Sequence, residues 1–323
     1  MIRLQLVPSL LAALGSALVA ALGPPSRLGA QEAPPPTAED LRIYALAVDS
    51  SAYPQESSIM LLQERTLRVE ADGTWTVRLR VVRQILTQAA VSGSAELSFG
   101  YDPEREEFSL DWARVVHADG GVVSAGPVHV QELDEPVSRS TPVYSDNKRV
   151  RATLGDVAVG RIVDWRSTQR VTDPPLPGDV FLRWYANGTT PLRRSRFVLD
   201  TPETLDVHIA EENLDGPTSV RQEGGRLVRE WSYEDVAAVE SEPFAADSNG
   251  VVQRVTVGPP MEWDEVARWY TALTRDRYSM TPELEARLSD LVADARTLDD
   301  SLRAVHRWIA QDVRYASISL GIG

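Results

Sequence analysis

Apolar and polar residues alternate through most of the middle of the chain. The segment TWTVRLRVVRQIL (Thr74–Leu86) places apolar residues and arginines in turn, which is the pattern of a strand with one buried face. An Asp-Gly pair at 72–73 separates it from the alternating run ERTLRVEA, and a second pair at 119–120 lies within DWARVVHADGGVVSAG. Because Asp-Gly between alternating runs favours a tight turn, we predict a β-hairpin at each position.

Similar short runs, broken by Gly, Pro, Asn and Asp, continue to about residue 245. They include GRIVDWRSTQRV, PLRRSRFVLDTP, LDVHIAEE and GGRLVREWSYEDV. About a dozen short strands with frequent turn residues are typical of an all-β sandwich. We therefore predict an antiparallel β-sandwich domain over residues 57–245. The chain has no fixed-period repeat, which argues against a propeller.

The hydrophobic period changes to that of helices after residue 260. We assign residues 246–260 to a linker that can hold one more strand. EWDEVARWYTALTRDR then gathers apolar side chains on one helical face, namely Trp263, Val266, Trp269, Tyr270 and Leu273.

Two further helices have clear start signals. In TPELEARLSDLVADA, Thr281 is the expected cap and Pro282 occupies the first turn. In TLDDSLRAVHRWIAQDV, Thr297 and Asp300 form an acidic capping box, and the apolar stripe comprises Leu302, Val305, Ile309 and Val313. The strand-like VRYASISLGIG follows. We predict that residues 261–323 are the N-terminal part of a mixed domain of helices plus one strand.

The first thirty residues have the pattern of a targeting segment. Arg3 precedes an apolar stretch, LVPSLLAALGSALVAALG, and Ala30 is a plausible cleavage residue. We expect a cleaved signal peptide over residues 1–30, with an uncleaved membrane anchor as the lesser alternative. A Pro-rich linker is expected at 31–56. The protein is then exported to the periplasm or the cell exterior, without a stable membrane span after cleavage.

Composition narrows the classes of partner and chemistry. The 323 residues carry a formal net charge of −14, which argues against a nucleic-acid partner because no basic patch is present. Lys148 is the single lysine. The chain contains no cysteine, so these residues cannot supply a disulfide, a thiol nucleophile or a cysteine-ligated zinc.

The sequence contains no recognisable catalytic pattern. The four histidines are too far apart in sequence for a local metal pair: His117, His129, His208 and His306. HIAEE lacks the second histidine of a metalloprotease motif. No Gly-x-Ser-x-Gly elbow, P-loop or dinucleotide fingerprint occurs. We predict no catalytic, cofactor-binding or metal-binding residue in this chain, and no cofactor.

Two clusters have alternative interpretations. The acids of YDPEREEF could begin a paired-carboxylate site, although a solvated turn is favoured; they are Asp102, Glu104, Glu106 and Glu107. RWYANG gathers Arg183, Trp184 and Tyr185, which could line a carbohydrate or peptide groove, although core packing is favoured. His306 lies off the apolar stripe of its helix, so we expect it at the surface.

Five segments, in this order, resemble a known bacterial family: VEADGTWTVRLRVVRQIL, GYDPEREEFSLDWARVVHADGGVV, PVYSDNKRVRATLGDVAVGRIVDW, EWDEVARWYTAL and AVHRWIAQDVRYASISLGIG. They are similar to the domain-of-unknown-function 3857 (DUF3857) family, which precedes a transglutaminase-like domain in exported proteins. Asp164 stands where that family commonly has an acidic residue. Glu262 stands where it usually has a Ser or Thr cap. The resemblance covers roughly residues 57–323.

The resemblance implies a function for the parent protein. Transglutaminase-like domains resemble papain-type enzymes, with a Cys nucleophile, a His and an orienting Asp. None of the three positions lies within this sequence, so we expect an N-terminal portion of a cysteine-dependent peptide or protein amide hydrolase or acyltransferase, inactive by itself. The alternative is a non-catalytic envelope-binding or scaffold module whose β domain recognises a peptide, a protein or a cell-envelope ligand. The oligomeric state is left open.

Overall fold

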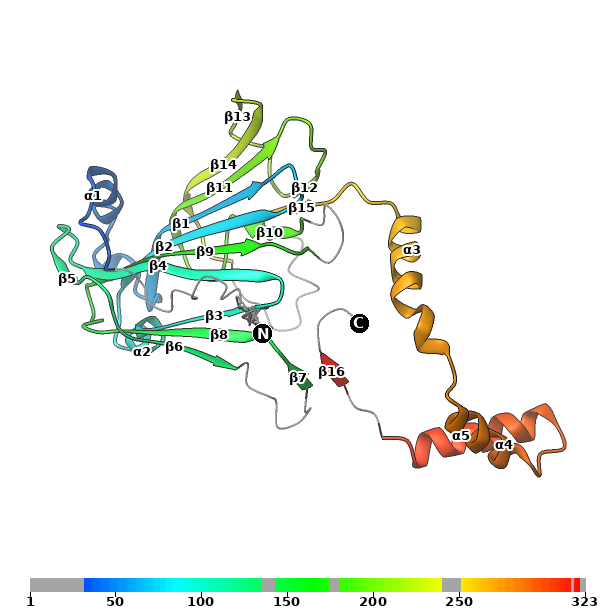
Figure 1. Cartoon of the computed structure of the whole chain (residues 1–323). Coiled ribbons are helices and arrows are strands. Elements are labelled where there is room, and N and C mark those ends of the chain that lie inside the picture. The colour runs from blue at the N-terminus through cyan, green and yellow to red at the C-terminus, as the bar shows by residue number, and fades with distance from the viewer. Residues whose placement is uncertain (1–31, 135–142, 175–179, 240–250, 315–316, 320–323) are drawn as a thin grey trace, which may run out of the picture.

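Strands dominate the protein, seen here in a computed structural model that describes residues 32–134, 143–174, 180–239, 251–314 and 317–319 (Figure 1). The largest sheet has eight strands in the order β13 (Ser219–Glu223), β14 (Arg226–Val236), β11 (Leu192–Pro202), β1 (Ser58–Val69), β2 (Trp75–Ile85), β9 (Ile162–Val171), β4 (Glu106–Val116) and β5 (Val122–Ser124). The mainly β architecture agrees with the sequence prediction.

Neighbouring strands of this sheet are antiparallel with one exception. β1 and β11 are parallel, and Met60 pairs with Leu192 at the start of their ladder. Every strand on the β1 side comes from residues 58–171, and every strand on the β11 side comes from residues 192–236. The sheet is therefore two sequence-continuous halves that meet at a single parallel ladder.

Both predicted hairpins are confirmed. β1 and β2 join through the turn that contains Gly73, and β4 and β5 join through the turn that contains Gly120. The backbone φ angles at these glycines are 85° and 88°, in the left-handed region that residues with a Cβ rarely adopt. At the second turn glycine has a further role, because a Cβ there would lie 2.2 Å from Leu41 Cδ2.

Two three-stranded sheets cover one face of the large sheet. One has the order β3 (Glu96–Tyr101), β8 (Lys148–Leu154), β6 (Pro127–Asp134), and the other β10 (Leu182–Tyr185), β15 (Arg254–Gly258), β12 (His208–Glu212). Ile85 packs in an apolar cluster with residues of the β3–β8–β6 sheet, and Val77 packs in another with residues of the β10–β15–β12 sheet. These residues are an even number of positions apart on the regular strand β2, so both small sheets lie on the same face.

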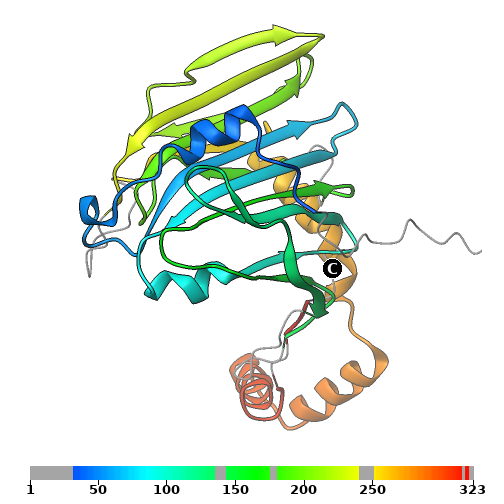
Figure 2. The same cartoon turned by 90° about the vertical axis from the view of Figure 1, so that its left-hand side faces the viewer.

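The opposite face carries α1 (Ala38–Tyr44), which Figure 2 shows lying across the strands. Ile43 and Tyr44 pack there with Val82 from β2. The sequence-based linker at 31–56 therefore differs from the structure, because α1 and the short helix η1 (Ser50–Ala52) occupy it. The additional strand allowed for within the linker at 246–260 is present as β15, but it is the central strand of a small sheet, where Val255 and Val257 are fully buried. We call residues 33–258 the β domain.

The helices after residue 260 begin where predicted. They are α3 (Trp263–Thr274), the short η3 (Arg275–Tyr278), α4 (Pro282–Val292) and α5 (Leu298–Gln311); α2 (Ala89–Ala95) lies within the β domain. Thr281 Oγ1 accepts a hydrogen bond from the Leu284 N–H, and Thr297 and Asp300 form the expected capping box. The Glu262 N–H donates to Glu265 Oε2 at 2.9 Å, which satisfies the backbone donor of the capping residue at the start of α3.

These helices stand away from the sheets (Figure 1). No described residue of α3, α4 or α5 is buried. Leu302 and Ile309 are 60% and 52% exposed, whereas other apolar residues of these helices are half-buried, among them Val266, Trp269, Leu273 and Val305. After α5 the chain returns to the β domain, where β16 (Ser317–Ser319) pairs in parallel with β7 (Val143–Ser145).

Within the described residues no helix is both long and apolar enough to cross a membrane. The predicted signal peptide at 1–30 lies outside the described part of the chain, as does most of the terminal segment after Arg314.

Candidate functional site

A cluster of buried charges fastens α1 to the large sheet. Asp164 on β9 is fully buried and Arg114 on β4 is 1% exposed. The Tyr44 hydroxyl donates to Asp164 Oδ2 at 2.6 Å, and Arg114 Nε and Nη2 donate to the same oxygen at 3.0 and 2.8 Å. Arg114 Nη1 also donates to the Pro34 carbonyl at 2.7 Å. The N-terminal segment is thus attached to the sheet at two points, through Tyr44 of α1 and through the Pro34 carbonyl before the helix.

A second arginine completes the cluster. Arg80 donates from Nε to Asp164 Oδ1 at 3.1 Å and from Nη2 to Asp40. Arg114 Nη2 lies 3.0 Å from Asp40 Oδ2. The ring of Trp112 lies 4.6 Å from the Arg114 guanidinium and 5.5 Å from that of Arg80, within the range of cation–π attraction. Two cations therefore face two anions, which limits the cost of burying them.

The electrostatics of this cluster indicate a structural role. Burial alone would raise the pKa of Asp40, but hydrogen bonds from the Thr37 backbone and from Arg80, together with the charge of Arg80, lower the pKa to about 2. Burial, together with the charge of Asp164, raises the pKa of the Tyr44 hydroxyl well above its ordinary value. Neither shift moves a group toward neutral pH, where a general acid or base has to titrate. The cluster acts as a clasp between α1 and the sheet.

Sequence reasoning found one member of this clasp and missed the others. Asp164 was singled out only through the family resemblance. Asp40 and Tyr44 fell within the expected linker, although Thr37 and Asp40 form a capping box whose pattern is visible in TAEDLRIY. That capping box, followed by apolar residues, was the available signal for α1.

The histidines are dispersed. His117 lies beside the β4–β5 turn, and all four histidine residues are exposed, including His306 as expected. The described residues contain no group of three or more His, Asp, Glu or Cys residues that could hold a metal ion.

The acidic run at 102–107 is organised as a turn. Asp102 Oδ1 accepts from the Glu104 N–H at 3.0 Å, and Glu106 Oε2 accepts from the Asp102 N–H at 3.0 Å and from Gln169 Nε2 at 2.8 Å. These bonds within the loop and to the neighbouring strand β9 fit the turn interpretation.

The aromatic cluster at 183–185 divides between core and surface. Trp184 is 1% exposed, and its ring centroid lies 5.5 Å from that of Phe197, so core packing is confirmed for this residue. Tyr185 is 40% exposed. The peptide carbonyls of Arg183 and Tyr185 accept hydrogen bonds from the side chains of Arg65 and Gln63 on β1. These two side chains therefore satisfy backbone acceptors of the strand β10.

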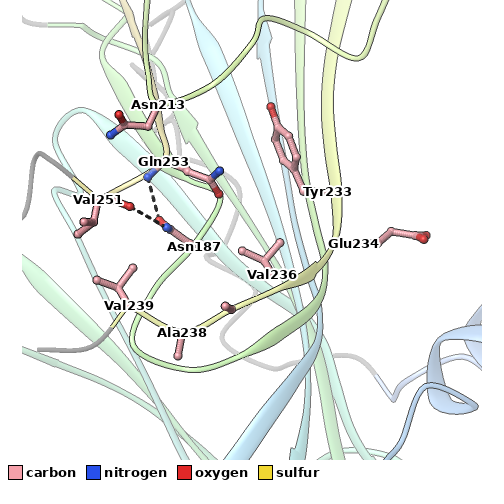
Figure 3. A pocket seen from close by; sticks show the side chains of 10 residues that line it. Asn187, Asn213, Tyr233, Glu234, Val236, Ala238, Val239, Val251 and Gln253 are labelled. Carbon is pink, nitrogen blue, oxygen red and sulfur yellow. Dashed lines mark hydrogen bonds between the residues drawn. The ribbon is translucent and has the colours of Figure 1, made fainter.

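An open pocket of about 690 Å³ lies where β14 ends beside the chain that enters β15 (Figure 3). Its size is within the range of ligand pockets. The lining residues come from four separated segments and are Asn187, Asn213, Tyr233, Glu234, Val236, Ala237, Ala238, Val239, Val251 and Gln253.

Two asparagines brace one wall of this pocket. Asn187 Nδ2 donates to the Val251 carbonyl at 3.1 Å, and Asn187 Oδ1 accepts from the Gln253 N–H at 2.9 Å (Figure 3). Asn213 Nδ2 donates to the Val252 carbonyl at 2.9 Å. The backbone of this wall is therefore held by side chains from the loops after β10 and β12. Sequence reasoning missed the pocket, because no local pattern links its four segments.

The chain is similar to a known family and, in its fold, to solved structures. The family model "Domain of Unknown Function with solved-structure structure (DUF3857)" matches residues 71–240. A crystal structure of a candidate protease from Parabacteroides distasonis is 14% identical with a TM-score of 0.66, and the alignment covers 80% of this chain and 50% of that one. This chain thus spans half the length of that protein. At such identity the similarity concerns the fold alone.

A zinc metallopeptidase of the M1 class from Deinococcus radiodurans is 11% identical, with a TM-score of 0.34 over 64% of this chain and 43% of that one. A TM-score this low supports no inference. No curated protein matches the chain.

Proposed function

The chain belongs to the DUF3857 family, and from that premise we propose that its β domain is a non-catalytic recognition and scaffold module of an exported transglutaminase-like protein. In this proposal the helices after residue 260 begin the transglutaminase-like domain. The parent protein acts on peptide or protein amides, and residues 1–323 hold and position that domain.

The return of the chain to the β domain is the observation that carries this proposal. The helical segment leaves from β15, at the centre of a small sheet, and comes back through β16, which pairs with β7. Both ends of the segment are therefore attached to the β domain, although α3 and α5 leave large apolar side chains exposed. This is the arrangement expected of a domain that is assembled on a scaffold and is covered by further chain.

The chemistry of these residues agrees with a structural role for the β domain and a catalytic role for another part of the parent protein. Acyl transfer by a transglutaminase-like enzyme needs a thiolate, and residues 1–323 contain no cysteine. The buried charges of the β domain form a clasp whose pKa shifts point away from neutral pH. In the proposal the nucleophile belongs to sequence outside these residues.

A comparison of two proteins tests the enzymatic part. The chain 1–323 and the product of the complete reading frame are purified and incubated with casein and a fluorescent amine. We expect amide cleavage or amine incorporation only in the longer protein, and its loss after iodoacetamide treatment. Activity in the chain 1–323, or iodoacetamide-resistant activity in the longer protein, would contradict the proposal.

The attachment through β16 is tested separately. Ser317→Pro together with Ile318→Pro removes two successive backbone N–H donors, of which at least one points to β7 because successive donors point to opposite sides of a strand. We expect faster amide hydrogen exchange at residues 143–145. The matched control, Ser317→Ala with Ile318→Ala, keeps the donors and should leave exchange unchanged. Equal exchange in both variants would refute the attachment.

Export is a further part of the proposal. It is supported by the Arg3 n-region, the apolar stretch and Ala30. Expression in a bacterial host with mass determination of the secreted or periplasmic product should give a mature chain beginning at Gln31. A full-length chain retained in the membrane fraction would favour the uncleaved anchor instead.

A binding module is the second candidate function. The pocket at the end of β14 favours it, because side chains from two loops hold one of its walls in place. This function does not require a following enzyme domain.

A further inference from the structure

We propose that the pocket between the end of β14 and the entry to β15 binds aliphatic side chains of an uncharged, extended peptide. This inference goes beyond the scaffold function and holds whether or not a transglutaminase-like domain follows. It depends on the shape, the lining and the charge of the pocket.

The wall of the pocket is formed before any ligand arrives. Asn187 and Asn213 donate two hydrogen bonds to the backbone of residues 251–253 and Asn187 accepts a third from it, and the Ala186 N–H donates to the Gln253 carbonyl at 2.9 Å. On the other side the Val239 N–H donates to the Gly188 carbonyl at 2.7 Å. A preformed site loses little conformational entropy on binding, which favours affinity.

The lining has a large aliphatic part. Half of it consists of small or branched apolar residues: Val236, Ala237, Ala238, Val239 and Val251. Val251 is 60% exposed. Covering these residues with another aliphatic group would remove apolar surface from water, which is the largest favourable contribution available here.

The charge of the pocket argues against an anionic ligand. None of its ten lining residues is Lys or Arg. Glu234 is paired with Arg194 and points away from the other lining residues (Figure 3). Burial, then the charges of Glu211 and Asp215, raises the pKa of Tyr233 at the rim, so two carboxylates lie close enough to act on this hydroxyl. Among the described lining residues a phosphate or carboxylate would find no cationic partner.

Two neutral polar groups remain to orient the ligand. The Gln253 side-chain amide extends across the pocket in Figure 3, and the Tyr233 hydroxyl lies at its edge. An amide both donates and accepts, so it matches the N–H and C=O of a peptide bond. In an extended peptide alternate side chains point to one side, which lets them enter the aliphatic part while the backbone contacts Gln253.

A sugar is the less suitable occupant. Sugar binding of this kind would use the ring of Tyr233, the single aromatic residue in the lining. That ring is stacked on Trp184, with the centroids 6.3 Å apart, so one of its faces is already covered. The aliphatic residues offer a sugar little to hydrogen-bond.

The test uses the intact chain and isothermal titration calorimetry. The probe is N-acetyl-Ala-Val-Ala-Val-Ala-amide; the charged comparison peptide has Asp in place of Val, and maltose serves as the sugar. We expect the neutral peptide to bind at least tenfold more tightly than the other two. No detectable binding of the neutral peptide, or tighter binding of maltose or the Asp peptide, overturns the proposal.

Variants assign the binding to this pocket. Ala238→Trp fills the pocket and should weaken peptide binding at least tenfold, and Gln253→Ala should weaken it several-fold. Val220→Trp, at a 56% exposed position on β13 outside the pocket, is the matched control and should bind normally. Equal thermal midpoints show that each variant is folded. If Ala238→Trp is folded but binds like the control, or if both Ala238→Trp and Gln253→Ala leave binding unchanged, the pocket is not the site.

Discussion

Replacing Asp164 with asparagine tests the clasp beneath α1 directly. The substitution keeps the shape of the side chain and removes its charge. Asp164 Oδ2 accepts hydrogen bonds from Tyr44, Arg80 and Arg114, at 2.6, 3.0 and 2.8 Å. In the variant the two guanidinium groups retain Asp40 as their only carboxylate partner within the clasp, and one asparagine N–H₂ faces donors instead of accepting from them.

The expected magnitude follows from the burial. Asp164 is fully buried and Arg114 is 1% exposed, and removal of one partner from a buried ion pair costs about 3–5 kcal/mol. For a domain the size of residues 33–258, each kcal/mol lowers the midpoint of thermal unfolding by about 2–4 °C. We therefore expect Asp164→Asn to melt about 6–20 °C below the parent chain.

Urea unfolding followed by circular dichroism measures the change. The midpoint should fall while the slope of free energy against urea stays constant, because the surface exposed on unfolding is unchanged. Glu107→Gln is the control: Glu107 on β4 faces Arg170 on β9 at 3.7 Å, and both side chains are more than half exposed. Its cost should be about 0–1 kcal/mol. A loss below about 1 kcal/mol in Asp164→Asn would refute the reasoning.

Three further predictions concern pH, a turn and the exposed helices. The fold lowers the pKa of Asp40 from 3.8 to about 2, so the contribution of Asp40 to stability is present above pH 4 and is lost as the pH falls toward 2. The fold raises the pKa of Tyr44, so stability falls as the pH rises above 10. Thermal melts of Asp40→Asn and Tyr44→Phe should each lack the corresponding dependence. Gly120→Ala should lower the free energy of unfolding in urea more than Gly160→Ala does. Both glycines have a positive φ, which costs an alanine about 1–2 kcal/mol of strain. Only the Cβ at position 120 would also collide with α1, because nothing lies within 4 Å of a Cβ at position 160. Ile309→Gln should change the unfolding free energy by less than about 0.5 kcal/mol, because this side chain is 52% exposed; a larger loss would show that the apolar face of α5 is covered in solution.

Local signals were sufficient for most individual elements. The Asp-Gly turns predicted their hairpins because the turn and its two strands are neighbours in sequence. Thr281 and Thr297 predicted the starts of α4 and α5 because a cap acts within one helical turn.

Sheet order could not be predicted in this way. The parallel pairing of β1 with β11 joins Met60 to Leu192, and no local pattern encodes a partner at that distance. β15 was missed as a core strand because five residues between turn-rich segments resemble a linker.

The residues of the candidate sites were also difficult to predict, because their partners are distant in sequence. Asp164 drew notice only through the resemblance to a family, and its hydrogen bond to Tyr44 spans 120 residues of sequence. The pocket draws on four segments, and its bracing asparagines resemble ordinary turn residues when the sequence is considered alone. Residues whose role depends on distant partners are visible only after the chain has folded.

The single parallel ladder between β1 and β11 has a consequence for how the chain acquires its fold. Residues 58–171 can pair among themselves as they emerge, but one side of β1 has no partner until residues 192–202 follow. An unpaired edge of this length is a template for association with other chains, and contacts between residues so far apart in sequence form slowly. The interval between the two halves is therefore when the protein is most exposed to aggregation and has most to gain from a chaperone.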